Sequence, residues 1–308
     1  MNYLRWLKEW RKFSQGSRKV LTMNQRNLHL IYPNNAREHF PMADNKLLTK
    51  EILTKCSVPI PETYTSYSSF YELQNLVRDL ADHDQFVIKP AQGSGGGGIM
   101  VIASKQDDAW VSVSGHKYSE ADIRKHIADI IFGVYSFGLT DQAIIEARVE
   151  QHSELTQLSP FGLADVRVIA YHEKPVLAML RVPTQGSDGK ANLHQGALGI
   201  GIDLETGHAI HAIHEGAAIT HHPDSGEELL GWAVPCWKEI IHFSKLSAAE
   251  LPLKYLGIDL AISSDGPLIL EVNARPGIEI QNANMLGMHP RLEQIEMLKQ
   301  QDNAGGCL

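Results

Sequence analysis

The sequence VIKPAQGSGGGGIMVI, residues 87–102, places Lys89 shortly before five glycines that fall within residues 93–98. Glycine has no side chain, so its backbone N–H groups can approach a ligand closely, and clustered N–H groups favour anions. The flanking segments FVIKP and IMVIA are apolar and rich in β-branched residues, which is typical of strands. We therefore expect a β-hairpin whose glycine loop binds phosphate.

Two common glycine motifs are disfavoured by their context. In the P-loop, GxxxxGK[ST], the lysine follows the glycines, whereas Lys89 precedes Gly93. The dinucleotide fingerprint GxGxxG is present at Gly93, Gly95 and Gly98, but it must lead from a strand into a helix, and here a second strand follows. A dinucleotide-dependent oxidoreductase is therefore a weak alternative, as is a disordered glycine linker.

Length and composition limit the class of protein. The chain has 308 residues, 43% of them hydrophobic, and three widely spaced cysteines, Cys56, Cys236 and Cys307. This is typical of a protein of about two domain-sized units in a reducing compartment. No apolar run is long enough to span a bilayer, and the N-terminus lacks the apolar core of a signal peptide. We expect a cytoplasmic protein.

The first 26 residues are basic, whereas the rest of the chain is acidic. Seven Lys or Arg residues accompany the single acid Glu9 there, although the whole chain has a net charge of −8. An acidic body argues against nucleic acid as a partner. Leu4, Trp6, Leu7 and Trp10 lie at helical spacing in this leader. It either packs onto the body of the protein or makes a peripheral contact with an anionic membrane or a partner.

Helix and strand signals are mixed along the chain. Helices are predicted at residues 43–56, 68–83, 119–134 and 235–251, the first with Asp44 as its N-cap and with Leu47, Leu48 and Ile52 facing inward. Strands are predicted at 86–90, 99–103, 142–150, 165–172, 174–182, 208–214, 255–263 and 267–274. Because the order lacks strict βαβ alternation, the expected fold class is α+β.

The segment GIDLAISSDGPLILEVNARPG, residues 257–277, predicts a second hairpin. Glu271 and Asn273 are two residues apart, so their side chains share one face of a strand, and Asp259 of the preceding strand can lie opposite them. Two carboxylates and an amide oxygen form the oxygen-only set that Mg²⁺ prefers. The alternative is a solvent-facing polar edge. Glu271 follows the apolar triplet LIL, where a buried residue is expected, which favours the metal site.

Cations are placed where phosphate chemistry would need them. Arg167 and Arg181 lie inside apolar strands, where an unpaired guanidinium is unfavourable, so each implies an anionic partner. Together with Lys46, Lys89 and Arg275 they could neutralise charge in phosphoryl transfer.

Five histidines also cluster in the sequence, at His208, His211, His214, His221 and His222. A zinc site there is disfavoured, because neither a cysteine nor a carboxylate pattern accompanies them.

The order of these segments resembles the ATP-grasp superfamily. DNKLLTKEIL, VIKPAQGSGGGGI, AIIEARV, DVRVIAY, NLHQGA and LILEVNARPG follow one another in the order of that superfamily between residues 42 and 280. Within it, the chain is most similar to the α-L-glutamate ligase-like, RimK-related proteins, which overlap the sugar-transfer-associated ATP-grasp group. The resemblance implies an ATP-grasp fold of two α+β subdomains that enclose a nucleotide cleft.

The resemblance also implies roles for individual residues. Lys46 and Lys89 match the lysines that contact ATP phosphates, and the loop over them comprises Gly93, Ser94, Gly95, Gly96 and Gly97. Glu146 matches the hinge strand that meets adenine, and either Glu150 or Glu154 matches the ribose contact. Asp259, Glu271 and Asn273 match the ligands of Mg²⁺, for which Mn²⁺ could substitute. The expected catalytic cations are Arg167, Arg181 and Arg275, and the expected substrate contacts are Asn192 and His194.

These matches predict the organisation and the activity. Residues 1–43 would form the basic leader, in place of the full domain that precedes this fold in many relatives, followed by subdomains at 44–142 and 143–300 and a flexible tail at 301–308. The expected function is ligation of a carboxylate and an amine, from amino acids or peptides, through an acylphosphate and without a covalent enzyme nucleophile. The alternative is a non-catalytic ATP-binding or scaffolding module of an envelope or peptide-modification system.

Overall fold

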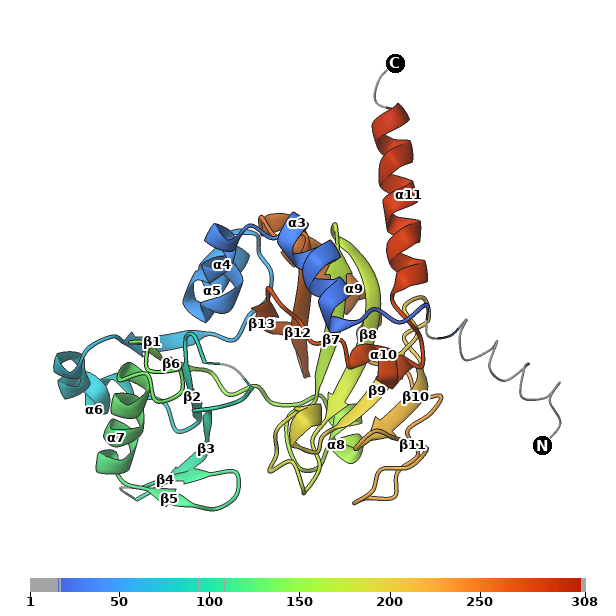
Figure 1. Ribbon diagram of the computed structural model, residues 1–308. Coiled ribbons are helices and arrows are strands. Elements are labelled where there is room, and N and C mark those ends of the chain that lie inside the picture. The colour runs from blue at the N-terminus through green and yellow to red at the C-terminus, as the bar shows by residue number, and fades with distance from the viewer. Residues whose placement is uncertain (1–15, 17, 94, 108, 306–308) are drawn as a thin grey trace. The chain divides into compact units, whose positions relative to one another are not determined.

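The chain folds into two compact units, whose bounds differ from those suggested by the sequence (Figure 1). The computed structural model describes residues 16, 18–93, 95–107 and 109–305, with residues 302–305 described by their backbone alone. One unit, the central unit, comprises Pro41–Glu150. The other, the two-segment unit, combines the described residues up to Phe40 with those from Gln151 onward. The boundaries therefore follow residues 40 and 150, whereas the sequence suggested 43 and 142.

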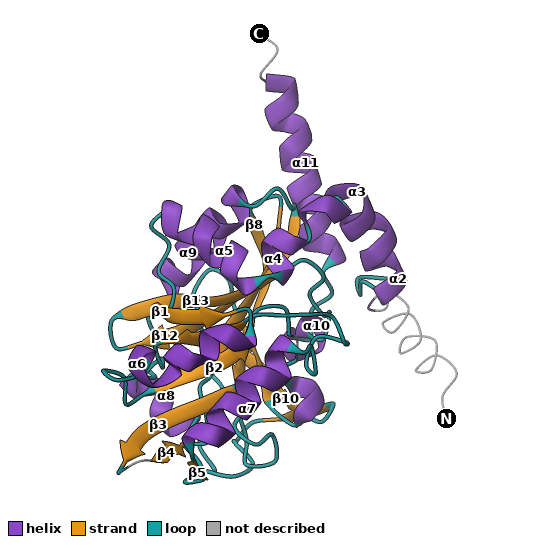
Figure 2. Ribbon diagram, turned by 90° about the vertical axis from the view of Figure 1, so that its left-hand side faces the viewer, coloured by secondary structure: helices purple, strands orange, loops and turns teal. Residues whose placement is uncertain are grey.

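The central unit is built on a six-stranded antiparallel sheet with the strand order β1-β6-β2-β3-β4-β5. Its helix α7 (Glu120–Ile131) packs against this sheet (Figure 2). The core joins Phe86 and Ile102 of the sheet to Ile123 and Ile127 of α7. The strands are β1 (Thr63–Tyr67), β2 (Phe86–Pro90), β3 (Met100–Gln106), β4 (Ala109–Ser112), β5 (Lys117–Tyr118) and β6 (Ala143–Glu146). The remaining helical segments are α4 (Pro41–Asp44), α5 (Lys46–Lys55), η3 (Phe70–Asn75) and α6 (Leu76–Asp79).

The predicted hairpin around the glycines is confirmed, because β2 and β3 pair antiparallel with Phe86 opposite Ile102 and Ile88 opposite Met100. The prediction for α5 was wrong in two respects. Its N-cap is Asn45, whose side chain accepts from Leu47 N at 2.9 Å, and Asp44 belongs to the preceding turn. Its buried residues are Lys46, Thr49, Lys50 and Leu53, and Leu48 is exposed. The two lysines can be buried because each has a polar partner: Lys50 pairs with the carboxylate of Glu146, and Lys46 donates to Gly93 O.

The two-segment unit contains a seven-stranded antiparallel sheet with the order β11-β10-β9-β8-β7-β12-β13. Helix α9 (Trp237–Glu250) packs on β7, β8, β12 and β13, and α10 (Ile280–Asn284) packs on β8, β9 and β10. The strands are β7 (Asp165–Tyr171), β8 (Lys174–Val182), β9 (Leu198–Ile202), β10 (Ala209–His214), β11 (Ala217–Ile219), β12 (Tyr255–Ser263) and β13 (Gly266–Asn273). The remaining helical segments are α8 (Ser153–Leu158), η4 (Leu193–Gln195) and α11 (His289–Gly305). Two antiparallel sheets with packed helices confirm the expected α+β class.

The segment before Pro41 is an integral part of the two-segment unit. It forms α2 (Met23–Gln25), the π-helix η1 (Arg26–Ile31), α3 (Tyr32–Asn34) and the 3₁₀ turn η2 (Arg37–His39). Leu21, Leu30 and Ile31 are buried in one core with residues of β7, β12, α10 and α11. The first part of the leader, with Trp6 and Trp10, lies outside the described residues.

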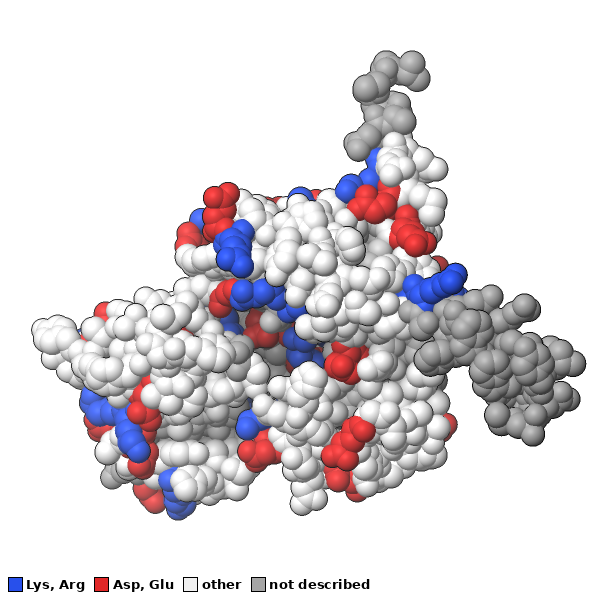
Figure 3. All heavy atoms as spheres, in the orientation of Figure 1, with Lys and Arg blue, Asp and Glu red and all other residues white. Residues whose placement is uncertain are grey.

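Two further expectations concern the end of the chain and its surface. Residues 301–305 continue α11, and residues 306–308 of the expected tail lie outside the described part. No described helix is both long and apolar enough to span a bilayer. On the face shown in Figure 3, Lys and Arg are interspersed with Asp and Glu between wide uncharged areas.

Candidate functional site

In the central unit, two lysines meet one buried carboxylate. Glu146 is 3% exposed at the end of β6; its Oε1 forms an ion pair with Lys89 of β2, and its Oε2 forms one with Lys50 of α5. Lys50 Nζ also donates to Pro61 O at 2.9 Å and to Thr63 Oγ1 at 2.8 Å, so all three of its N–H groups have partners. Burial lowers the pKa of Lys50, and the charge of Glu146 opposes that shift. Lys89 is buried as well, and its Nζ pairs with the same carboxylate.

The glycine loop is fixed at both of its ends. Lys46 Nζ donates to Gly93 O at 2.8 Å, and His126 Nε2 lies 2.9 Å from Gly98 O. A Cβ atom at residue 93 would lie 2.2 Å from Pro90 Cγ, which explains the glycine there. Between the two anchors, Gly95 and Gly97 are exposed, and Ser94 lies outside the described residues. The exposed backbone of the loop is thus available to an anionic ligand, with Lys46 at its start.

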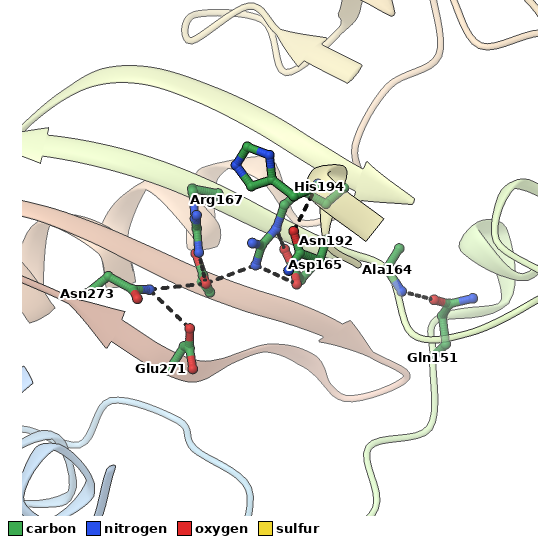
Figure 4. Close-up of polar contacts among 10 residues, drawn as sticks. Gln151, Ala164, Asp165, Arg167, Asn192, His194, Glu271 and Asn273 are labelled. Atoms are coloured by element: carbon green, nitrogen blue, oxygen red, sulfur yellow. Dashed lines mark hydrogen bonds and ion pairs between the residues drawn. The ribbon is translucent and has the colours of Figure 1, made fainter. Parts of the chain in front are cut away.

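In the two-segment unit, two arginines share two buried carboxylates on neighbouring strands (Figure 4). Arg167 of β7 donates from Nε and Nη2 to the two oxygens of Asp259 on β12, at 2.7 and 2.5 Å. Arg181 of β8 donates to Asp165 at 2.6 and 2.8 Å, and its Nη2 also reaches Asp259 Oδ2 at 2.9 Å. The anionic partners implied for both arginines are therefore carboxylates of the same sheet.

These charges determine the ionisation of the two acids. Asp259 is 1% exposed, and burial opposes its ionisation, but Arg167 and Arg181 hold its pKa well below the usual range. Burial raises the pKa of Asp165 to about 6, because Arg181 offsets the burial only in part. Asp165 is therefore expected to take up a proton at a higher pH than an exposed aspartate would.

The predicted metal-ligand residues lie together on the last hairpin. Asp259 of β12 is opposite Glu271 of β13, and Gly257 is opposite Asn273. Asn273 Nδ2 donates to Asp259 Oδ2 at 3.3 Å and to Glu271 Oε1 at 3.2 Å, so the three polar groups point toward one another, as Figure 4 shows for Glu271 and Asn273. Among the described residues, no group of three His, Cys, Asp or Glu side chains is arranged so that these side chains alone could hold a metal ion. The donor set of two carboxylates and one amide nevertheless fits Mg²⁺ by its chemistry.

The other predicted site residues lie at the ends of elements. Arg275 is exposed two residues after the end of β13, with its Cζ 4.9 Å from the centre of the Phe40 ring. Asn192 is the N-cap of η4, and its Oδ1 accepts from His194 N at 3.0 Å. Glu154, in the first turn of α8, and Glu150, which precedes Gln151, are both exposed.

Sequence reasoning missed two residues of these clusters. Lys50 was taken for an ordinary helix residue, although it lies four residues after Lys46 and hence on the same helix face. Asp165 lies two residues before Arg167 and therefore on the same face of its strand. These spacings were the available signals.

Comparison with known proteins places the chain in a family. The model of a family described as sugar-transfer-associated ATP-grasp matches residues 25–297. Two curated relatives are named probable alpha-L-glutamate ligase. The one from Trichodesmium erythraeum is 24% identical over 76% of this chain and 57% of its own length. The one from Syntrophotalea carbinolica is 22% identical over 81% of this chain and 61% of its own length. The chain thus spans less than two thirds of either relative.

Among solved structures, D-alanyl-alanine synthetase A from Vibrio cholerae is similar in part. It is 12% identical, with a TM-score of 0.46, over 82% of this chain and 60% of the other.

Proposed function

The chain belongs to the sugar-transfer-associated ATP-grasp family, and from that premise we propose that it is an ATP-dependent carboxylate-amine ligase. The observation that carries the proposal is the cluster of polar side chains of Asp259, Glu271 and Asn273 on one hairpin, flanked by the guanidinium groups of Arg167 and Arg181. Phosphoryl transfer depends on positioned positive charge, and this cluster combines fixed arginines with oxygen ligands for a cation.

In the central unit, we assign nucleotide phosphates to Lys46, Lys89 and the glycine loop. Lys89, Lys50 and Glu146 together carry one net positive charge, because two lysines share the single carboxylate of Glu146. The exposed backbone at Gly95 and Gly97 could donate to phosphate oxygens. Glu146 is proposed to lie next to adenine, and its side chain also orients Lys89.

In the two-segment unit, Asp259, Glu271 and Asn273 would hold Mg²⁺, which supplies charge neutralisation to the phosphates when bound. Asp259 is itself fixed by both arginines, so the position of the hairpin is set before any ligand binds. Arg275, exposed at the end of the same hairpin, is proposed to contact the transferred phosphate or the substrate carboxylate. Asn192 and His194 are proposed to lie on the substrate side.

The reaction would proceed in two displacements. A carboxylate oxygen of the acid substrate attacks the γ-phosphorus of ATP, the bond from that phosphorus to ADP breaks, and an acylphosphate forms. The nitrogen of the amine substrate then attacks the acyl carbon, the bond to phosphate breaks, and the amine loses a proton as the amide forms. The role of the residues above is to neutralise charge and to hold the reactants in line.

The substrates and the setting are proposed as well. Glutamate is the first candidate acid, since the curated relatives are named for it, and amino acids or short peptides are the candidate amines. We propose a cytoplasmic location, in keeping with three cysteines that are far apart in the sequence.

The test is ADP release by the full chain with ATP, Mg²⁺ and a library of acids and amines. Hydroxylamine is added to trap the acylphosphate as a hydroxamate. Glu271→Ala is expected to lower ADP release on the order of 100-fold, because one cation ligand and its charge are lost. The matched control, Glu205→Ala, removes an exposed glutamate outside the cluster and should release ADP like the unchanged protein.

Two results would contradict the proposal. Equal turnover by Glu271→Ala and the unchanged protein would remove the metal assignment. ATP binding without ADP release or hydroxamate across the library would instead favour the non-catalytic ATP-binding module.

A further inference from the structure

The turn that carries Arg275 is held by hydrogen bonds on both sides. Asn35 Nδ2 donates to Ala274 O at 3.0 Å, and Arg26 Nη1 donates to Pro276 O at 2.8 Å. Both donors come from the N-terminal segment, which is more than 200 residues away in the sequence. The backbone before and after Arg275 is therefore fixed by a different part of the chain.

Asn35 has no freedom to move, because its side chain uses all of its hydrogen-bonding capacity. Besides Ala274 O, its Nδ2 donates to Tyr255 O at 2.7 Å, and its Oδ1 accepts from Lys254 N at 2.9 Å and from Tyr255 N at 3.0 Å. It is 2% exposed. Asn35 thus ties the start of β12 to the residue that follows β13.

The turn that carries Arg275 also packs against the backbone of strand β12. A Cβ atom at Gly257 of β12 would lie 2.6 Å from Pro276 Cβ, so the proline ring rests directly on the strand backbone. Gly257 is the residue opposite Asn273. The glycine therefore couples the position of the turn to the strand pair that carries Asp259, Glu271 and Asn273.

The side chain of Arg275 has a support of its own. Its Cζ lies 4.9 Å from the centre of the Phe40 ring, within the range of a cation–π contact. Phe40 is half-buried and packs against the core of the two-segment unit, whereas Arg275 is exposed. The aromatic face of Phe40 thus limits the rotamers that the Arg275 side chain can adopt.

Arg26 adds charge as well as a hydrogen bond. It is 7% exposed, and burial lowers the pKa of its guanidinium, with the charge of Arg275 acting in the same direction. Nε and Nη2 of Arg26 donate to Asn27 Oδ1 at 3.1 and 2.8 Å. An anion next to Arg275 would therefore also be attracted by Arg26.

We infer that Arg26, Asn35 and Phe40 form a brace that positions Arg275 and Asn273 for the reaction. The inference rests on the proposed function, in which Arg275 contacts the transferred phosphate or the substrate carboxylate. The three are positioning residues, since they act through the turn and not by touching the substrate. Their effect should therefore appear in kcat more than in the KM for ATP, and it should depend on Arg275 being present.

The first experiment varies only the aromatic face in the full chain. Phe40→Leu keeps an apolar side chain at this place and removes the ring, so kcat for ADP release should fall about three- to fivefold. Phe40→Trp keeps a ring and should retain kcat within about twofold. Phe137→Leu, the same change at a fully exposed phenylalanine (93% exposed), is the matched control.

The second experiment asks whether the brace acts through Arg275. Arg26→Leu should lower kcat in the otherwise unchanged chain, and its effect should be smaller in an Arg275→Gln background, as expected for coupled residues. The thermal unfolding temperature of each variant shows whether a fall in kcat comes from loss of the fold or from displacement of Arg275 in a folded protein. Additive losses from Arg26→Leu and Arg275→Gln, or a Phe40→Leu variant as active as the control, would overturn the inference.

A third measurement is independent of turnover and separates this inference from the proposed function. The side-chain Nε–H signal of Arg275, assigned by its loss in Arg275→Lys, should be shifted by the Phe40 ring. The shift should disappear in Phe40→Leu and decrease in Arg26→Leu. An unchanged signal in both would overturn the brace even if the enzyme is active. Conversely, if the signal shifts as expected but the protein releases no ADP, the brace is supported and the proposed ligase activity is contradicted.

Discussion

The charges of single residues set the character of each cluster. Glu146 faces two lysines, and Lys50 satisfies all three of its N–H groups with Glu146, Pro61 and Thr63. Lys50 cannot contact a ligand without giving up one of these bonds, yet it balances the buried carboxylate. Its role is therefore electrostatic: the trio of Lys50, Lys89 and Glu146 has a net charge of one positive unit, which remains for an anion near Lys89.

Removal of that balancing charge should weaken nucleotide binding. In Lys50→Met the trio becomes neutral, so we expect ATP to bind about tenfold more weakly, roughly 1.4 kcal/mol. In Lys50→Met with Glu146→Gln the net positive charge returns, and a part of the affinity should return with it. Calorimetric titration with ATP measures both.

The control is Lys55→Met, which removes an exposed lysine of the same helix. If Lys50→Met and Lys55→Met bind ATP equally well, the balancing role of Lys50 is wrong.

His126 makes the central unit sensitive to pH. Burial lowers its pKa below 6.5, and the hydrogen bond to Gly98 O opposes the shift only in part. Just below pH 6.5 the folded state then binds fewer protons than the unfolded state, so the free energy of unfolding should fall as the pH is lowered from 7 toward 5. His126→Gln should show a flatter dependence in urea unfolding measured across that range.

His116→Gln, at an exposed histidine of the same unit, should retain the slope of the unchanged protein. An equal slope in both variants would mean that His126 does not link stability to pH.

For single residues, the sequence predicts which polar side chains of a hairpin meet better than it predicts the ion-pair partners of a residue on another strand. The residue types at Asp259, Glu271 and Asn273 and their spacing were enough to predict their meeting, because a two-residue turn region fixes a hairpin locally. The partners of Arg181 were not predictable, because Asp165 and Asp259 reach it only through the pairing of β7 with β8 and β12. That register depends on the packing of the whole sheet.

At the scale of elements, strand β9 and helix α10 pack closely because β9 has a glycine, Gly201, where their backbones meet. A Cβ atom at Gly201 would lie 2.5 Å from Ala283 O and 2.6 Å from Asn284 Cα, so the helix backbone rests on the strand backbone. Asn284 Nδ2 then donates to Ala178 O at 2.9 Å on the neighbouring strand β8. Close approach at this point fixes α10, which lies between β13 and α11 in the chain.

Gly201→Ala should therefore destabilise the protein by about 1–3 kcal/mol, because backbone atoms must move to admit the methyl group. Urea unfolding monitored by circular dichroism measures the change. Gly186→Ala is the control, since its Cβ would lie 3.7 Å from Thr184 Oγ1, an ordinary contact. A Gly201→Ala variant as stable as this control would contradict the proposed close packing.

Elements were predictable where local signals decide them. The hairpin β2–β3 and the helix α7, capped by Ser119, follow from β-branched runs and a capping box. The buried face of α5 was not predictable, because apolar periodicity favoured Leu48, whereas Lys50 turns inward to pair with the buried Glu146 and Lys46 turns inward to donate to Gly93 O. The π-helix η1 has no local signal, and its Arg26 is fixed by Pro276 of the far end of the chain.

For the whole molecule, the discontinuity of the two-segment unit has a direct test. The central unit has a core of its own and a continuous sequence, so a fragment of residues 41–150 should unfold cooperatively by itself. A fragment of residues 151–308 lacks Leu21, Leu30 and Ile31, which belong to its core, and it should bind a hydrophobic dye and aggregate. Joining residues 16–40 to this fragment through a flexible linker should restore cooperative unfolding.

A fragment 151–308 that unfolds cooperatively without residues 16–40 would show that the N-terminal segment is dispensable for the fold. Sequence alone did not predict this dependence. The leader was treated as a separate basic region, because its contacts with Tyr255, Pro276 and Gln281 span more than 200 residues and leave no local pattern.

Because the two-segment unit is built from two separate stretches of the sequence, the ribosome synthesises its two parts at different times. Residues 16–40 leave the exit tunnel first, but the strands that cover Leu21, Leu30 and Ile31 are not translated until the whole of residues 41–150 has followed. At about 5–20 residues per second this delay lasts several seconds or longer. The nascent chain therefore exposes an unburied apolar segment ahead of a domain that can already be complete, and that interval is when a chaperone would find it.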